Sequence, residues 1–234
     1  MPHPLPLQRS RPLDTIDIDR DYGRAPQQSR SQKTLIRITD AAEKLFADRG
    51  YEGASINDIV ARAHCSVGAF YARFKDKESL FLHIHDQQCG LLIQRIEFLC
   101  DLFKSENASL DVMLRQSVRA LLLFAEQRRA LTRVFIQRSG TDADFHARYA
   151  KTWGRVRDLL RPPMLSRKHE ISRSEPEHAI DFVLQLMHSG WANDVLHHRM
   201  KYITGQKTGE ELIEDLSEAC LSYLGIAITK RDKS

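Results

Sequence analysis

The stretch SINDIVARAHCSVGAFYARFKDKESLF, residues 55–81, decides the fold of this chain. Its apolar residues recur at the spacing of one helix face, which predicts a helix over residues 55–63 and another over residues 66–74. Ser55 and Ser66 stand where the two helices begin, and serine is a preferred residue at a helix N-cap. The segment HCS between the helices is too short to be anything but a tight turn.

The second helix of this pair has an unusually slim front. Gly68 stands inside it, where a glycine costs roughly 1 kcal/mol relative to alanine. Two short helices joined by a tight turn, with a longer helix before them, make a helix-turn-helix, whose second helix enters the major groove of DNA. A residue without a side chain lets the backbone approach base edges and phosphates. Phe70 and Phe74 are expected to face the core, while the leading edge is formed by Ser66, Val67, Gly68 and Ala69.

Several side chains around this helix are candidates for contact with DNA. Tyr71 follows Phe70 by about 100° around the helix, so its hydroxyl could reach a phosphate or its ring a thymine methyl. Lys75 and Lys77 flank the start of the next helix, whose exposed N–H groups favour an anion. The candidate DNA-binding residues are Ser55, Ser66, Val67, Gly68, Ala69, Tyr71, Arg73, Lys75 and Lys77.

Residues 32 to about 85 resemble the N-terminal domain of the TetR/AcrR family of bacterial transcriptional regulators. The matching stretches are AAEKLFADRGYEGASINDIVARA and SVGAFYARFKDKESLF. Where the family usually has glycine in the turn, this chain has His64, at a site that often adopts a left-handed conformation. The resemblance implies that Val67, Ala69 and Arg73 lie near base edges, and that phosphates are contacted by Ser55, Gly68, Tyr71, Lys75 and Lys77.

The rest of the chain is also helical by its pattern. Period-3.6 spacing predicts a first helix from Ser31 to a C-cap at Gly50, and a long fourth helix that begins after Asp76. No segment shows sustained alternation of apolar and polar residues, so the expected fold class is all-α. Further helices are predicted over residues 109–127, 129–138, 142–161, 175–200 and 208–227, the last two after capping boxes at Ser174 with Glu177 and at Thr208 with Glu211.

The expected organisation is an N-terminal three-helix helix-turn-helix domain followed by a larger helical domain. Five of the eight prolines lie in the first 30 residues, which show no helical or strand period, and this predicts a flexible arm. Its arginines could contact DNA, but interleaved aspartates nearly cancel their charge, so the arm could equally be a solvated tail. The resemblance implies that the larger domain binds a ligand and forms a dimer. The expected boundaries are 1–30 for the arm, 31–85 for the DNA-binding domain, 86–228 for the helical domain and 229–234 for a tail.

The resemblance also implies a homodimer that is formed by the last two long helices of each subunit. Two-fold symmetry would then match a palindromic operator in double-stranded DNA. The alternative is that the apolar stripes of these helices bury only the core of a single chain. The candidate interface residues are Ile180, Val183, Leu184, Met187, Trp191, Leu212, Leu216, Cys220 and Tyr223.

A pocket for a small-molecule effector is expected between the long helices, again from the resemblance. Arg129 and Arg133, four residues apart in the acid-free run QRRALTRVFIQR, could meet an anionic ligand or pair with acids elsewhere in the fold. Each of the large candidate residues could equally be plain packing. These pocket candidates are Phe103, Met113, Phe124, Phe135, Tyr149, Trp153 and Met187.

Composition and motifs speak against several other classes of protein. The net charge of +4 permits a polyanionic partner without requiring one. Four scattered cysteines with no CxxC pair indicate a reduced, cytoplasmic compartment, and no segment has the length of a membrane span. His85 and Cys89 are four residues apart but have no obvious third metal ligand. We also find no nucleophile beside a base and no glycine-rich phosphate loop, so we expect no metal, no cofactor and no enzymatic activity.

The sequence therefore predicts a ligand-responsive, DNA-binding transcriptional repressor that acts as a homodimer on a palindromic operator and is released by a small molecule. The alternative is a helical interaction or assembly factor without sequence-specific DNA binding. The two differ in salt dependence and in resistance to competitor DNA, because only a sequence-specific regulator combines a steep salt slope with survival of competition.

Overall fold

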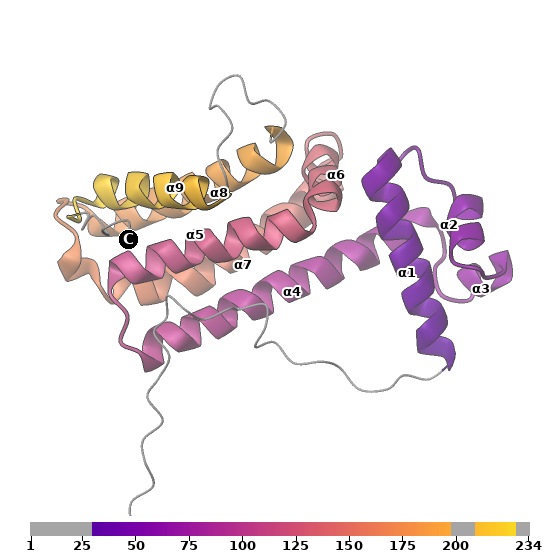
Figure 1. Ribbon diagram of the computed structural model, residues 1–234, viewed down its shortest axis with the longest axis horizontal. Helices are drawn as coiled ribbons and strands as arrows, with labels where there is room; N and C mark the ends of the chain where they lie inside the picture. The colour runs from indigo at the N-terminus through magenta and orange to yellow at the C-terminus, as the bar shows by residue number, and fades with distance from the viewer. Residues whose placement is uncertain (1–29, 198–208, 228–234) are drawn as a thin grey trace, which may run out of the picture.

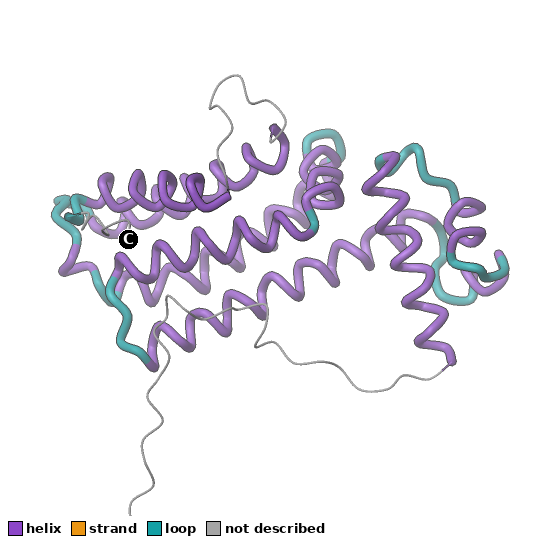
Figure 2. Tube along the Cα trace, viewed as in Figure 1, coloured by secondary structure: helices purple, strands orange, loops and turns teal. Residues whose placement is uncertain are grey.

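A computed structural model describes residues 30–197 and 209–227, and within those ranges every regular element is a helix (Figures 1 and 2). The expected all-α fold, with a helix-turn-helix domain before a helical domain, is confirmed. The expected arm, apart from Arg30, and the tail lie outside the described residues. The elements are α1 (Arg30–Arg49), α2 (Ile56–Arg62), α3 (Val67–Tyr71), α4 (Lys77–Ser105), α5 (Leu110–Gln127), α6 (Arg129–Ser139), α7 (Ala143–Leu165), a 3-10 turn (Lys168–Glu170), α8 (Pro176–His197) and α9 (Gly209–Leu224).

The long helices form one bundle, and the helix-turn-helix lies at its end. Helix α4 runs from the N-terminal unit into the bundle beside α5 and α7, while α8 and α9 cover the other side of α5 (Figure 1). Helices α1, α2 and α3 gather around the first turns of α4, away from α8 and α9 (Figure 1). The recognition unit is therefore presented at one tip of an elongated molecule.

Capping side chains fix the starts of the short helices. Ser55 Oγ accepts the backbone N–H of Asp58 at 3.1 Å, and the Asp58 carboxylate accepts the N–H of Ser55 in return. Ser66 Oγ accepts the N–H of Ala69 at 3.1 Å, and Asp76 accepts the N–H of Ser79 at 2.7 Å. Each such cap contributes about 1 kcal/mol, so these local patterns are sufficient to place the helix-turn-helix.

Helix α3 is shorter than the predicted helix over residues 66–74. It ends at Tyr71, and Arg73 N–H already donates to the carbonyl of Phe70, three residues back, instead of four. The chain must turn here because Asp76, the N-cap of α4, has an extended backbone. The predicted C-terminal end of this helix was wrong. Phe74 continues the apolar pattern because it is buried in the core, but the helix has ended before it.

Helix α7 is longer than the predicted helix over residues 142–161, and it contains Pro162 and Pro163. Pro163 has no N–H to donate to the carbonyl of Leu159, four residues earlier, which normally ends a helix. That carbonyl accepts a hydrogen bond from Cys100 Sγ at 3.5 Å. A neighbouring helix thus supplies a donor for one of the two carbonyls that the prolines leave without one, and α7 continues to Leu165.

Helix α8 begins differently from the prediction. It starts at Pro176, and Ala179 N–H donates to the carbonyl of Glu175, so Ser174 is not its N-cap. Proline suits the first helical position, where its missing N–H has no intrahelical acceptor to lose. The predicted capping box at Ser174 is therefore wrong, while Thr208 and residues 198–200 lie outside the described residues.

The hydrophobic core of the N-terminal unit crosses the expected domain boundary at residue 85. Phe46, Phe70 and Phe81 are buried in this core. It is completed by side chains from α6 and the first turn of α7, namely Leu131, Val134, Phe135 and Phe145. The helix-turn-helix is thus packed directly against two helices of the larger domain.

A second core fills the bundle, and it contains most of the predicted dimer stripes. Trp191 is buried and donates its indole N–H to the carbonyl of Leu121 at 3.1 Å. Helices α8 and α9 pack closely, since a Cβ atom at Gly190 would lie 2.9 Å from Leu216 Cδ2. The stripes face their own chain because α5, α7 and α9 surround α8. The candidates buried within a single chain are Ile180, Val183, Leu184, Met187, Trp191 and Cys220, while Leu212, Leu216 and Tyr223 are half-buried.

One buried histidine lies where the two cores meet. His85 on α4 is 1% exposed, and its ring lies edge-on to Phe135 and Phe145, at centroid distances of 5.1 Å and 4.8 Å. Burial lowers the pKa of His85, although the neighbouring Asp86 acts in the opposite direction. Protonation of His85 therefore opposes folding.

None of the described helices is both long and apolar enough to span a membrane.

Lowering the pH from about 7.5 to about 5.5 should reduce the free energy of unfolding, because the unfolded chain binds a proton near the ordinary histidine pKa of about 6.5 while His85 resists protonation. The loss is at most about 1.4 kcal/mol per pH unit for each such histidine. In chemical denaturation, His85→Leu should flatten this dependence, whereas His169→Leu, at an exposed position, should not. Identical pH profiles for His85→Leu and the wild type would contradict a neutral, buried His85.

Candidate nucleic-acid interface

Helix α3 has a buried side and an uncovered apolar side. Phe70 and Phe74 are buried in the N-terminal core, as predicted. Val67 is 42% exposed and Tyr71 is 55% exposed, and both are among the most exposed large apolar residues of the described chain. The Tyr71 ring lies edge-on to Phe70 at 5.4 Å, which orients it while leaving its outer side open.

Gly68 occupies a position where the folded chain does not need a glycine. A Cβ atom there would have Ser66 Oγ, 3.9 Å away, as its nearest neighbour, which is an ordinary contact. By contrast, a Cβ atom at Gly53 would lie 2.4 Å from the backbone oxygen of Arg49, and Gly50 has a φ of +72°. The fold requires glycine at positions 50 and 53 but not at 68. Any requirement for glycine at position 68 therefore arises from a partner outside the chain.

The turn between α2 and α3 depends on a residue with a left-handed backbone. His64 has a φ of 49°, the conformation expected where the resemblance places glycine. Its carbonyl accepts a hydrogen bond from Arg37 Nη1 on α1, at 3.5 Å. The turn is therefore formed without glycine and is tied to the preceding long helix.

Several of the candidate DNA-binding side chains are occupied within the protein. Ser55 Oγ donates to the carboxylate of Asp58 at 2.7 Å, besides capping α2. Arg73 folds back, with Nη1 donating to the carbonyl of Ala69 at 2.8 Å and Nη2 to the carbonyl of Ser31 at 3.2 Å. Arg73 thus joins α3 to the first turn of α1, whereas Lys75 remains exposed.

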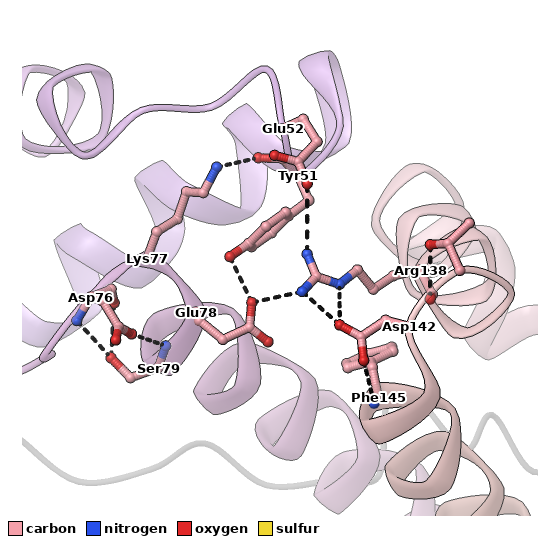
Figure 3. A network of polar contacts seen from close by, with 10 residues as sticks. Tyr51, Glu52, Asp76, Lys77, Glu78, Ser79, Arg138, Asp142 and Phe145 are labelled. Atoms are coloured by element: carbon pink, nitrogen blue, oxygen red, sulfur yellow. Dashed lines mark hydrogen bonds and ion pairs between the residues drawn. The ribbon is translucent and has the colours of Figure 1, made fainter.

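Lys77 is also held by the protein, through Tyr51. Its Nζ donates to the backbone carbonyl of Tyr51 at 2.9 Å and lies 4.2 Å from the centre of the Tyr51 ring. Figure 3 shows Lys77 and Arg138 on either side of that ring, and the guanidinium carbon of Arg138 lies 4.1 Å from its centre. The Tyr51 hydroxyl donates to the Glu78 carboxylate at 2.6 Å.

Arg138 links the helix-turn-helix to the turn between α6 and α7. Its Nη2 donates to Glu78 at 3.0 Å and to Asp142, the N-cap of α7, at 2.8 Å. Burial alone would lower the pKa of Arg138, but its ion pairs with Asp142 and Glu78 outweigh that effect and raise it. Burial and the bond to Glu78 raise the pKa of Tyr51, so its phenol stays protonated. The sequence indicated Arg138 only as part of a basic run, because Glu78 and Tyr51, its partners in the helix-turn-helix domain, are far away in the chain.

The predicted effector pocket is divided between two clefts of about 750 Å³ each. Trp153 and Met187 line the cleft between α7 and α8, while Phe103 and Met113 line one between the ends of α4 and α7. Phe135 instead packs in the N-terminal core, because α6 lies against α1 as well as against α7 and α8. Phe124 and Tyr149 line neither of these clefts.

The basic run and the candidate metal pair have ordinary structural roles. Arg129 donates to Asp194 at 2.7 Å and pairs with Glu126, as expected for a basic side chain that finds acids elsewhere. His85 and Cys89 are in contact at 3.4 Å. Within residues 30–197 and 209–227, no group of three or more His, Cys, Asp or Glu side chains is arranged to hold a metal ion.

Comparison with known proteins agrees with this geometry. Residues 38–84, which contain the first helices and the turn at His64, match the family model described as "Bacterial regulatory proteins, tetR family". Residues 38–84 of this chain therefore form a domain of the tetR family. The N-terminal domain is accordingly a helix-turn-helix DNA-binding domain of the kind found in transcriptional regulators.

Curated relatives match this chain over a part of its length. The A-factor receptor protein of Streptomyces griseus is 42% identical over 62 residues, which is 26% of this chain and 22% of that protein. The fatty acid metabolism regulator protein of Bacillus subtilis is 31% identical over 62 residues, 26% of this chain and 32% of that protein. The chain thus matches less than half the length of these two relatives.

Solved structures share the fold of the whole described chain. A TetR-family regulator from Mesorhizobium loti superposes with a TM-score of 0.66 at 21% identity, covering 85% of this chain and 98% of that one. FadR of Bacillus subtilis, in complex with stearoyl-CoA, also has a TM-score of 0.66, at 17% identity, covering 80% and 98%. The helical bundle is therefore a TetR-family fold as well.

Gly68→Ala should separate stability from DNA binding. Alanine fits the open space at position 68 and should raise the free energy of unfolding by up to about 1 kcal/mol, since it favours the helix. Its methyl group should nevertheless weaken DNA binding, because it separates α3 from the groove. Thermal melting and fluorescence anisotropy with labelled DNA measure the two effects.

Gly90→Ala is the matched control for this substitution. Gly90 lies within α4, and a Cβ atom there meets nothing within 4 Å. It should stabilise the protein to a similar extent without altering its affinity for DNA. Unchanged DNA affinity in Gly68→Ala would contradict a close approach of DNA to this backbone.

Proposed function

We propose that the chain is a cytoplasmic transcriptional repressor that binds a palindromic operator as a homodimer and is released from it by a small molecule. The observation that carries this proposal is the front of α3. There Gly68, which the fold itself does not require, lies between the exposed side chains of Val67 and Tyr71. This surface belongs to the domain that matches the tetR family.

In this proposal each side chain of the interface has a distinct task. Val67, Gly68 and Ala69 lie against base edges, where small groups and a methyl contact fit the major groove. Tyr71 and Lys75 contact phosphates, and the helix starts at Ser55, Ser66 and Lys77 add backbone N–H groups and charge. Arg73 supports α3 against α1 through its bonds to Ser31 and Ala69.

The dimer interface is proposed to lie on the outer face of α8 and α9 rather than on their buried stripes. Phe182 on α8 is 40% exposed and contacts the half-buried Tyr223 of α9, with ring centroids 4.5 Å apart and the ring planes tilted by 35°. Aromatic side chains at the protein surface are frequent anchors of protein interfaces. A two-fold axis through this face would place two copies of α3 for the half-sites of a palindrome.

DNA binding is tested with the promoter region that adjoins the gene. The wild-type protein should bind this DNA with a steep salt dependence and in the presence of competitor DNA. Tyr71→Ala should weaken binding about tenfold or more, and Tyr71→Phe, which keeps the ring, separates the contribution of the hydroxyl. Binding that is no tighter than to random DNA of equal length would instead favour a helical interaction or assembly factor.

The cleft between α7 and α8 is the proposed effector site. Buried Leu184 and Met187 form an apolar floor, and Trp153 meets His188 edge-on, with ring centroids 4.3 Å apart. Burial lowers the pKa of His188, which favours its neutral form at the cleft wall. Such a site suits a ligand with an apolar or aromatic body. That FadR of Bacillus subtilis holds stearoyl-CoA supports a ligand role for a domain of this fold.

Ligand binding at this cleft has a built-in reporter. Of the two tryptophans of the chain, Trp153 lines this cleft and Trp191 packs against it, with ring centroids 4.5 Å apart. The aromatic probe 1-anilinonaphthalene-8-sulfonate should quench their emission saturably. Gly154→Phe, which places a ring in open space at the cleft, should abolish quenching, whereas Asp101→Phe at the second cleft should not. Equal quenching in Gly154→Phe and the wild type would place the ligand elsewhere.

A further inference from the structure

We propose that Arg138, on α6 of the larger domain, is a positioning residue for the phosphate contact of Lys77 and acts through Tyr51. This inference rests on the proposed DNA-binding function. It assigns a role in DNA affinity to a side chain that lies outside the helix-turn-helix. Figure 3 shows the chain of contacts from Asp142 through Arg138 and Tyr51 to Lys77.

The first step is that Tyr51 fixes the position of the Lys77 charge. A lysine ammonium has three N–H donors on a flexible stem. One donor of Lys77 is used by the Tyr51 carbonyl at 2.9 Å, and the ammonium lies 4.2 Å above the Tyr51 ring. The remaining two donors are available to a phosphate at the start of α4. The location of this charge therefore follows the location of Tyr51.

The second step is that Tyr51 lies in a connection with no helix to hold it. It follows Gly50, the left-handed residue that ends α1, and precedes the N-cap of α2. Its ring rests on Phe46 and Phe81, at centroid distances of 5.7 Å and 4.8 Å. The hydroxyl is bonded to Glu78, so the face that is left for further support is the one that Arg138 occupies.

The third step is that Arg138 both supports the ring and occupies the acids around it. Its guanidinium lies 4.1 Å from the centre of the ring and bonds Glu78 at 3.0 Å, while Glu52 lies 3.9 Å away. Without this guanidinium, Glu78 would keep only the Tyr51 hydroxyl among these partners, and its carboxylate would become a competitor for Lys77. Arg138 therefore keeps the Lys77 ammonium directed toward DNA.

The fourth step is that Arg138 is fixed by the larger domain. Asp142, the N-cap of α7, accepts from Arg138 Nε at 3.2 Å and from Nη2 at 2.8 Å. A guanidinium is planar and can hold several acceptors at once, which an ammonium cannot reproduce in the same geometry. Lysine at position 138 would preserve the charge but not the simultaneous contacts with Asp142, Glu78 and the Tyr51 ring.

The test measures how the affinity for the promoter DNA depends on salt, because each phosphate contact that is lost lowers the slope of log K against log [salt] by about 1. In a dimer, Lys77→Met should lower the slope by about 2 and the affinity about tenfold or more. Arg138→Lys should produce the same loss although it keeps the charge. The double variant Lys77→Met with Arg138→Lys should lose no more than either single variant.

Two controls separate positioning from general effects. Arg133→Lys changes another arginine of α6 in the same way and should leave the slope unchanged. Tyr51→Phe keeps the ring between the two cations and should retain most of the slope. Melting temperatures of all variants show that the comparison is made between folded proteins, and a merely structural role of Arg138 would lower melting without changing the slope.

The outcomes distinguish this inference from the proposed function. If the wild-type protein shows no preference for its promoter, both fail. If Lys77→Met loses the expected slope but Arg138→Lys retains the wild-type value, the inference alone is overturned. If the double variant loses DNA affinity by the product of the two single losses, the inference is overturned too, because Arg138 would then act independently of Lys77.

Discussion

The packing of Phe81 against three other aromatic rings is the interaction on which the rest of the structure depends. The Phe81 ring is fully buried on α4 and lies 5.3 Å from Phe46, 5.4 Å from Phe135 and 5.3 Å from Phe145, measured between ring centroids. One side chain thus joins α1, α6 and α7 to the helix that follows the recognition unit. Loss of a buried phenylalanine costs about 3–5 kcal/mol, a large part of the 5–15 kcal/mol that stabilises a typical domain.

This shared core explains how a slim helix can be presented with a defined orientation. Helix α3 spans only Val67–Tyr71 and is too short to be stable by itself. Phe70 attaches it to the common core, and Arg73 ties it to the start of α1. The contacts that hold α3 in place therefore lie on its inner side. Gly68 and Tyr71, on the outer side, remain accessible to a partner.

The sequence was sufficient where the structure is decided locally. Caps such as Ser55 and Asp76, and the opposite faces of Phe70 and Tyr71, follow from residue types at fixed spacings, so the helix-turn-helix could be located before its coordinates were known. A stripe of apolar residues, however, does not indicate whether a helix of the same chain or of a second subunit covers it. The α8 stripe around Met187 was predicted at a dimer interface, but it packs within one chain.

Features that depend on distant contacts could not be predicted. Arg138 and Glu78 are 60 positions apart, and nothing near either residue in the sequence indicates the pair. Helix α7 passes Pro163 because Cys100, 59 positions away from Leu159, approaches the carbonyl that lacks a partner. The joint between the two domains and the length of α7 are therefore tertiary effects. The proposed effector cleft belongs to the same class, since it is lined by residues of both α7 and α8 and not by a single sequence motif.

The central claim is that the helix-turn-helix and the α6–α7 corner form one cooperative unit around Phe81. Hydrogen exchange of the full-length variant Phe135→Leu, which trims a ring on α6 that contacts Phe81, tests this claim most directly. The account predicts that protection falls together in α1, α4 and α6, because these helices share one core. Loss of protection in α6 alone, with α1 and the first turns of α4 unchanged, would contradict it.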